Sequence, residues 1–453
     1  MHSPTRRSFI RQAACAALGT AGVVNTIFDL RKLSAATPTD KGDYKALVCL
    51  FLFGGNDANN MLIPYDASSY ASYSTARGAL ALPRASLLPL KLQKGDGREF
   101  AFHPKIPEMQ SLFNEGKLGI VANVGTLAAP ITRAQFLSKS AAVPRQLFSH
   151  ADQSVQWQTS VADQMVRTGW GGRAGDLLQS LNAESKISLA ISIAGTNTFE
   201  VGNKVVPYQI SPTGPIALQG FDGSANASVR YQAFRELLAL PHHNLFEQAY
   251  ADTVQRAIAD KELLSAALGA APKLQTAFPP TGLGRQLNMV ANLIAVRRQL
   301  NMRRQIFFVA VQGYDTHGGQ LRAQANLLGE LSQGLGSFYK ATSELALAEQ
   351  VTTFTASDFG RTFPTSGSGS DHGWGSHQFV LGGAVRGGRL FGTFPTLAVN
   401  GPDDTGQGRW IPTTSVDEMA ATLATWFGVS ASDLPTVLPN IGRFAKPNLG
   451  FFA

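Results

Sequence analysis

The chain has 453 residues, of which 44% are hydrophobic and 15% are charged, and its formal net charge at pH 7 is +8. So high an apolar content with so few charges excludes a disordered chain and allows one large domain or two domains. Runs of like charge and stripes of alternating basic and aromatic residues do not occur in the sequence, so nucleic acid is not an expected partner.

The first 36 residues have the features of an export signal. The stretch "TRRSFIRQ" contains Arg6 and Arg7 ahead of a phenylalanine, and residues 13–24 are apolar but too few to span a bilayer. Small residues at 34–36 provide a cleavage site. This order resembles a twin-arginine signal, which implies the translocase of that pathway as a partner and a periplasmic or extracellular location, with no stable membrane span after cleavage. An amphipathic N-terminal helix is the alternative.

Six short apolar runs follow, and each ends at Gly, Asp or Ser. Runs that are apolar at nearly every position are typical of strands covered on both faces, so they predict a parallel sheet. These runs lie at residues 45–57, 117–125, 187–195, 305–315, 350–358 and 377–383.

Helical periodicity lies between the apolar runs. Apolar residues recur at helical spacing over residues 328–338, residues 416–429 form an amphipathic pattern, and residues 228–304 are almost wholly helical in pattern. The alternation of strands and helices predicts a single α/β domain over residues 45–453. We expect a three-layer α/β/α sandwich around a mostly parallel sheet, with the helical insertion at about 228–304 packed against it.

Acidic residues and histidines follow the ends of the predicted strands. The carboxyl ends of parallel strands meet at one edge of a sheet, where ligands bind. A single Asp-x-His in a loop is often a hydrogen-bonded turn, but several such pieces at successive strand ends favour a metal site. Carboxylates and imidazoles together suit Zn or Mn better than Ca or Mg. The expected ligands are Asp57, Asp315, His317, Asp358, Asp371, His372 and His377.

The order of six motifs from about residue 45 to the C-terminus resembles the alkaline phosphatase and sulfatase superfamily. They are "FLFGGNDANNMLIPYD", "FSHADQSVQWQTS", "RTGWGGRAGD", "GYDTHGGQ", "ASDFGRTF" and "GSDHGWGSHQFVLGGAVRGGRLFG". Within that superfamily, the order is most similar to an exported bacterial family catalogued as domain of unknown function fifteen-oh-one. The resemblance implies an alkaline-phosphatase-like fold and a metal-dependent hydrolase of phosphate or sulfate esters, with a small anionic ester as substrate.

The resemblance also implies roles for the metal ligands. Asp57 closes the first strand, as does the aspartate that binds one ion in the superfamily. Asp315, His317 and either His372 or His377 match the residues that bind the other ion.

A second full metal site is less well matched. The superfamily has an Asp-His pair after a later strand, whereas Asp358 is followed here by Phe359. The pair Asp371 and His372 is the alternative source of that histidine. One or two ions are therefore compatible with the sequence, and a non-catalytic descendant that binds a metal or an anion at the cell surface is the alternative function.

The superfamily nucleophile lies at a helix N-terminus, where free N–H groups and the helix dipole favour an anion. Ser149, with His150 beside it, matches that element, although Ser149 and Asp152 also have the spacing of a helix cap. Arg361 is the candidate anion clamp, because a guanidinium suits phosphate or sulfate oxygens, and an exposed loop arginine is its alternative. The absence of a Cys-x-Pro-x-Arg element from the sequence disfavours formylglycine chemistry.

Changing Arg6 and Arg7 together to lysine is expected to keep the protein in the cytoplasm, because the arginine pair is the feature that the translocase recognises. Cell fractionation followed by immunoblotting measures the outcome. Arg11→Lys is the matched control and should leave export unchanged. Export of the double variant at the wild-type level would contradict the predicted signal.

Overall fold

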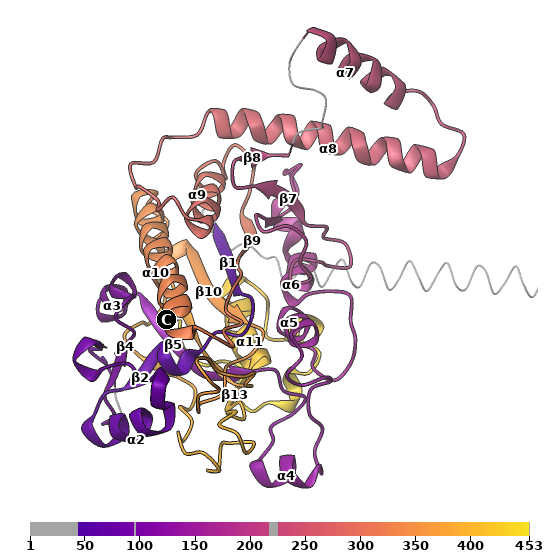
Figure 1. The fold of residues 1–453 in the computed structure, drawn as a ribbon. Helices are drawn as coiled ribbons and strands as arrows, with labels where there is room; N and C mark the ends of the chain where they lie inside the picture. The colour runs from indigo at the N-terminus through magenta and orange to yellow at the C-terminus, as the bar shows by residue number, and fades with distance from the viewer. Residues whose placement is uncertain (1–43, 95–96, 217–224, 453) are drawn as a thin grey trace, which may run out of the picture.

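Figure 1 shows the computed structural model of the protein, which describes residues 44–94, 97–216 and 225–452. The predicted signal and its cleavage site lie outside the described residues. The strands of the large sheet are β1 (Lys45–Leu52), β5 (Leu118–Gly125), β6 (Ala190–Ser192), β7 (Tyr208–Ser211), β8 (Gly214–Pro215), β9 (Arg304–Val311), β10 (Val351–Ser357), β11 (Ser376–Leu381), β12 (Leu390–Phe391) and β13 (Thr414–Ser415).

The sheet is mostly parallel, as the sequence predicted. Its strand order is β12-β5-β11-β10-β1-β9-β6-β7-β8, and β13 pairs with β5. The central strand β1 pairs in parallel with both β9 and β10, so these three strands end at the same edge. The strand β11 is an exception, because it runs antiparallel to both β10 and β5.

Two hydrophobic cores lie on opposite faces of the sheet. Successive residues of a strand face opposite sides, and in β1 Val48 and Leu50 belong to one core while Cys49 and Phe51 belong to the other. Burial of each large apolar side chain stabilises the fold by roughly 2 kcal/mol. Burial on both faces explains why the strand sequences are apolar throughout rather than alternating.

Helices cover both faces, which confirms the three-layer sandwich (Figure 1). The first face is covered by α3 (Pro107–Asn114), α9 (Gly282–Ala295) and α10 (Gln320–Glu344). The second face is covered by α5 (His150–Thr159), α6 (Trp170–Leu178), α11 (Val416–Phe427) and α12 (Leu434–Val437). A short helix, α4 (Arg133–Ser138), lies in the connection before α5.

The helices predicted between residues 228 and 304 are present as α7 (Ala225–Leu238), α8 (Leu245–Gly269) and α9. Only α9 and the end of α8, through Leu264 and Ala267, contribute buried residues to the main core. The expectation that the whole insertion packs against the sheet is therefore wrong for α7 and the start of α8, which project from the body. None of the helices in the described part of the chain has the length and apolar character needed to cross a bilayer.

A buried ion pair attaches a small lobe to the central sheet. The lobe contains α2 (Ala67–Arg77) and a second sheet of β2 (Leu62–Pro64), β3 (Leu88–Pro89) and β4 (Phe100–Phe102). Arg77, at the end of α2, pairs with Asp57 just beyond β1, and both side chains are fully buried. The Arg77 guanidinium also donates to the carbonyl oxygens of Thr362 at 3.1 Å and Phe363 at 2.9 Å. One side chain thus connects three segments.

Arg77→Met is expected to lower the free energy of unfolding by about 3–5 kcal/mol, because it leaves the Asp57 carboxylate buried without its cation. Urea denaturation followed by circular dichroism measures the change. Arg84→Met, at an exposed site in the same lobe, is the control and should cost less than about 1 kcal/mol. An equal decrease in the free energy of unfolding in the two variants would mean that the buried ion pair does not stabilise the fold more than an exposed arginine does.

Candidate metal centre

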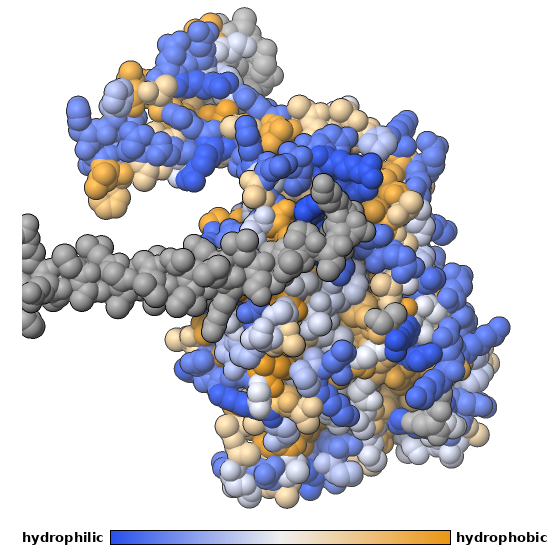
Figure 2. Space-filling model, turned by 180° about the vertical axis from the view of Figure 1, so that it is seen from behind, coloured by the Kyte–Doolittle hydropathy of each residue, from blue (hydrophilic) through white to orange (hydrophobic). Residues whose placement is uncertain are grey.

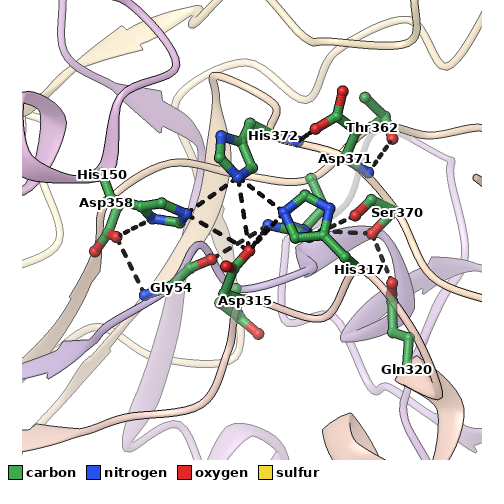
Figure 3. A network of polar contacts seen from close by, with 12 residues as sticks. Gly54, His150, Asp315, His317, Gln320, Asp358, Thr362, Ser370, Asp371 and His372 are labelled. Atoms are coloured by element: carbon green, nitrogen blue, oxygen red, sulfur yellow. Dashed lines mark hydrogen bonds and ion pairs between the residues drawn. The ribbon is translucent and has the colours of Figure 1, made fainter.

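Three histidines and one aspartate meet at the carboxyl edge of the sheet (Figure 3). Asp315 and His317 follow β9, His150 is the first residue of α5, and His372 lies in the loop before β11. The Asp315 Oδ1 atom lies 2.9 Å from Nε2 of His317, 3.5 Å from Nε2 of His150 and 3.6 Å from Nε2 of His372. The His372 Nε2 atom lies 3.0 Å from its counterpart in His317 and 3.1 Å from that in His150.

Three of these side chains, from His150, Asp315 and His372, form one group that could hold a metal ion. With Zn–N bonds of about 2.0–2.1 Å, adjacent ligand atoms of a tetrahedron lie about 3.3 Å apart. Within this group the three separations range from 3.1 to 3.6 Å and so bracket that value. Because unprotonated imidazole nitrogens this close repel each other, a cation or a shared proton is needed between them.

Hydrogen bonds orient two of the imidazoles. The Nδ1 atom of His150 lies 2.6 Å from Oδ2 of Asp358, and the Nδ1 atom of His372 lies 2.8 Å from the carbonyl oxygen of Phe148. Both partners are acceptors, so each Nδ1 carries a proton and each neutral ring presents its Nε2 lone pair to the cluster. Such outer partners are typical of metal-ligating histidines.

The surroundings shift the pKa values of these two imidazoles in opposite directions. The hydrogen bond to Asp358 raises the pKa of His150. Burial lowers the pKa of His372, which favours the neutral ring that a metal requires.

Phe148 adopts a φ of 74°, in the left-handed region that non-glycine residues rarely occupy, and its carbonyl is the acceptor for His372.

Asp358 reaches the cluster through His150. Its side chain is buried, and its Oδ2 atom also accepts the Gly54 backbone N–H at 3.1 Å. The other oxygen, Oδ1, is buried with no hydrogen-bond partner among the described residues. We therefore place Asp358 behind the cluster, as the group that orients His150.

Asp371 lies at the rim of the cluster. It forms a second group of metal-ligand type with His317 and His372, so the two groups share His372. The Oδ2 atom of Asp371 lies 2.9 Å from Nη2 of Arg409, and its Oδ1 atom accepts the backbone N–H of His372 at 2.8 Å. An ion at this second position would have to compete with the arginine for the carboxylate.

Asp57 does not join the cluster, so the expectation that all the predicted ligands converge is corrected here. Its carboxylate is held by Arg77 and by the side-chain amide of Gln320. Both contacts are buried, and they direct the carboxylate into the protein. The prediction that Asp57 is a metal ligand is therefore wrong.

His377 is also left out of the cluster. It lies within β11, its Nδ1 atom accepts the backbone N–H of Asn123 at 3.0 Å, and its ring stacks on Phe394 at 4.9 Å. Burial lowers the pKa of His377 to about 3. Because β11 begins at Ser376, the imidazole belongs to a strand in the core, and the expectation that it is a metal ligand is wrong.

Phe359 fills space beside the cluster at the position where the superfamily pattern has a histidine. It is fully buried, and its ring centroid lies 4.7 Å from those of both His150 and His372. A Cβ atom at Gly55 would lie 2.6 Å from the Phe359 ring, so a glycine is needed there. The apolar ring supplies no ligand for a second ion.

Ser149 is the N-cap of α5. Its Oγ atom accepts the Asp152 backbone N–H at 3.5 Å and donates to the Asp152 carboxylate at 2.7 Å. The capping interaction considered from the sequence is therefore present. A cap does not exclude a nucleophile, because both require the same helix start.

Arg361 is buried rather than exposed. Its guanidinium donates to Asp315 Oδ1 at 2.8 Å, to the Gly54 carbonyl at 3.3 Å and to the Ser370 carbonyl. These contacts orient the Asp315 carboxylate and direct the guanidinium at protein acceptors. The geometry thus favours Arg361 as a support for Asp315 over a clamp for an external anion.

His150 is the cluster residue whose position the sequence did not indicate. It was singled out as a neighbour of Ser149 rather than as a ligand, because it follows no predicted strand. Its partner Asp358 is 208 positions away in the chain. The start of a helix next to a capping serine was the only local signal.

The sequence match identifies a family. Residues 44–434 match the model described as "Protein of unknown function (DUF1501)", and this range covers most of the chain. The chain therefore belongs to this family. A search of curated proteins found no match.

Solved structures with weak similarity include a sulfatase from Pseudoalteromonas sp. (10% identity, 90% of this chain and 73% of the other, TM-score 0.34). Others are a lipoteichoic acid synthase from Listeria monocytogenes (7%, 92% and 81%, TM-score 0.36) and a phosphonate monoester hydrolase from Silicibacter pomeroyi (7%, 85% and 74%, TM-score 0.35). Similarity this weak says nothing about substrate or mechanism.

Purified protein is expected to contain one Zn or Mn ion per chain, and His372→Ala is expected to lose most of it, because His372 belongs to both groups of possible ligands. Elemental analysis after exhaustive dialysis measures the content. His103→Ala is the control, since His103 is buried away from the cluster with its Nδ1 atom bonded to the Lys105 N–H. Full occupancy in His372→Ala, or wild-type protein that takes up neither metal, would contradict the assignment.

Proposed function

We propose that this member of the DUF1501 family is an exported hydrolase of phosphate or sulfate esters that uses one divalent metal ion, Zn or Mn. The observation that carries the proposal is the convergence of three imidazole Nε2 atoms and one carboxylate oxygen within 3.6 Å of their neighbours. The ester substrate is supported by the order of motifs along the chain. Export is supported by the twin-arginine pattern.

His150, Asp315 and His372 would hold the ion, and His317 is the fourth group. When bound, a divalent ion polarises an ester oxygen and lowers the pKa of a nearby water or hydroxyl. A catalytic zinc site has three protein ligands and one open position, whereas a structural site is closed by four. The side chain of His317 is 51% exposed, the most of the three histidines, so His317 is the group that would yield its position to substrate.

The residues at the start of α5 would bind and attack the ester. The free backbone N–H groups of this helix end favour an anionic group. The hydroxyl of Ser149 is hydrogen-bonded to the Asp152 carboxylate at 2.7 Å, so a proton acceptor is already in place for it. We assign Ser149 as the nucleophile and Asp152 as the group that accepts its proton.

A non-catalytic metal-binding protein is the second candidate. It is favoured by Phe359, whose apolar ring takes the place of a further ligand. Both candidates require the metal. They differ in whether any ester is turned over.

Removal of the Ser149 hydroxyl tests the hydrolase. Ser149→Ala is expected to lower kcat for the best substrate among nitrophenyl phosphate monoesters, phosphate diesters and sulfate esters by about 100-fold or more, with metal content unchanged. Spectrophotometric release of nitrophenol in the presence of Zn or Mn measures it. Activity in Ser149→Ala within threefold of wild type would assign the attack to a metal-bound water instead.

The variant Ser149→Asp distinguishes the role of Ser149 as a nucleophile from its role as a helix cap. Aspartate is a good N-cap and preserves the helix start, whereas alanine costs about 1 kcal/mol of stability there. Equal loss of activity in both variants, with a stability loss only in the alanine variant, is the expected pattern. A folded, metal-containing wild-type protein that turns over none of these esters would favour the non-catalytic candidate.

A further inference from the structure

The helices α7 and α8 form an arm that extends from the body of the protein. Figure 1 shows the two helices antiparallel to each other, with the turn between them far from the sheet. In Figure 2 the arm stands clear of the rest of the surface. The arm is therefore free to contact another molecule.

The end of the arm is apolar and exposed. Leu245 and Phe246 are 86% and 87% exposed, which is unusual for side chains of this size. Three further residues of the same end, Leu237, Leu240 and Tyr250, are more than half exposed. We call these five residues the arm tip.

The arm tip is a continuous surface with a groove. Leu237, Phe246 and Tyr250 line a groove of about 530 Å³ together with Phe234 and His242. The buried core of the arm itself is small and consists of Leu238, Ala251 and Ile258, separate from the main core. Two helices with so small a core gain little stability from each other. Burial of the apolar tip against another surface would therefore stabilise the arm.

The exposed apolar area of the arm tip is large enough to form one side of a protein–protein interface. An aromatic side chain presents about 150–250 Å² when free and an aliphatic one somewhat less, so the five tip residues leave roughly 700 Å² open to water in one copy. The largest apolar patch of a typical monomer is about 300–600 Å². Two tips that bury each other remove roughly 1,400 Å², within the range of about 1,200–2,000 Å² for stable interfaces.

The charges on the arm favour a second copy over a lipid surface. Glu236, Glu247 and Asp252 lie near the tip with one arginine, Arg235, so the tip lacks the cluster of basic side chains that an anionic membrane attracts. Farther along α8, Arg256 and Lys261 are balanced by Asp260 and Glu262, so that segment is not basic either.

We propose that the arm is a self-association surface, through which two copies of this chain pair by packing their arm tips against each other. Paired hairpins are a standard way for two-helix units to bury apolar faces. The interface is isologous, so the same tip residues serve both copies. The proposal is independent of the metal centre and of the proposed hydrolase activity.

The oligomeric state of the full chain tests the proposal. Sedimentation velocity and light scattering after size-exclusion chromatography are expected to give twice the chain mass at micromolar concentration. The double variant Leu245→Glu with Phe246→Glu is expected to give the mass of one chain, because its dimer dissociation constant is at least tenfold higher than that of the wild type. Met165→Glu is the control, because Met165 is 84% exposed outside the arm, and it should remain dimeric.

Each other outcome overturns the proposal. Wild-type protein that is monomeric at these concentrations, or a tip variant that stays dimeric, rules out pairing through the arm. Co-sedimentation of a monomeric wild type with phosphatidylglycerol vesicles, lost in the tip variant, would assign the tip to a lipid surface. Circular dichroism of the tip variant separates loss of pairing from loss of fold, since both changed residues lie at the surface.

Discussion

The approach of the backbone after β1 to the ends of β9 and β10 is the constraint on which the candidate metal centre depends. The strands β9, β1 and β10 are adjacent and parallel, so their carboxyl ends lie side by side. Gly54, just beyond β1, has a φ of 115°, and a Cβ there would lie 2.3 Å from the Asp315 backbone nitrogen. Its own N–H donates to Asp358 beyond β10. A side chain at Gly54 would separate the segments that carry Asp315 and Asp358.

A chain of buried polar contacts extends this arrangement into the protein. It runs from Asp57 through the Gln320 amide to the Ser370 hydroxyl, and from Ser370 through Arg361 to the Asp315 carboxylate. Burying charge is costly unless each charge is paired and hydrogen-bonded, and here every link is made. The effect of this network is geometric, because it holds Asp315 in one orientation toward the histidines.

Phe359 changes what the centre can hold. Its ring lies against two of the three imidazoles, where it restricts their rotation and keeps polar groups away. The ring adds no ligand to the group of His150, Asp315 and His372, so the proposed chemistry depends on the side chains around it. This explains why the hydroxyl and carboxylate at the start of α5 receive the chemical roles in the proposed mechanism.

Local patterns in the sequence predicted the parts of the fold that depend on burial. Apolar runs of 6 to 8 residues became β1, β5, β9, β10 and β11, because a strand covered on both faces needs apolar side chains at every position. The same reasoning placed Asp315, His317 and Asp358 at one edge. It also predicted the helices of the insertion from their period.

The sequence by itself therefore determined the layers and the edge at which polar residues gather, since both follow from the burial and spacing of neighbouring residues. Only the tertiary structure decided which of these residues touch. His150 joined the cluster through contacts with residues more than 200 positions away, while Asp57 turned to Arg77 and His377 turned into the core. The physical reason is that side-chain partners are set by the packing of distant segments, and a local pattern contains no information about which distant segment lies opposite.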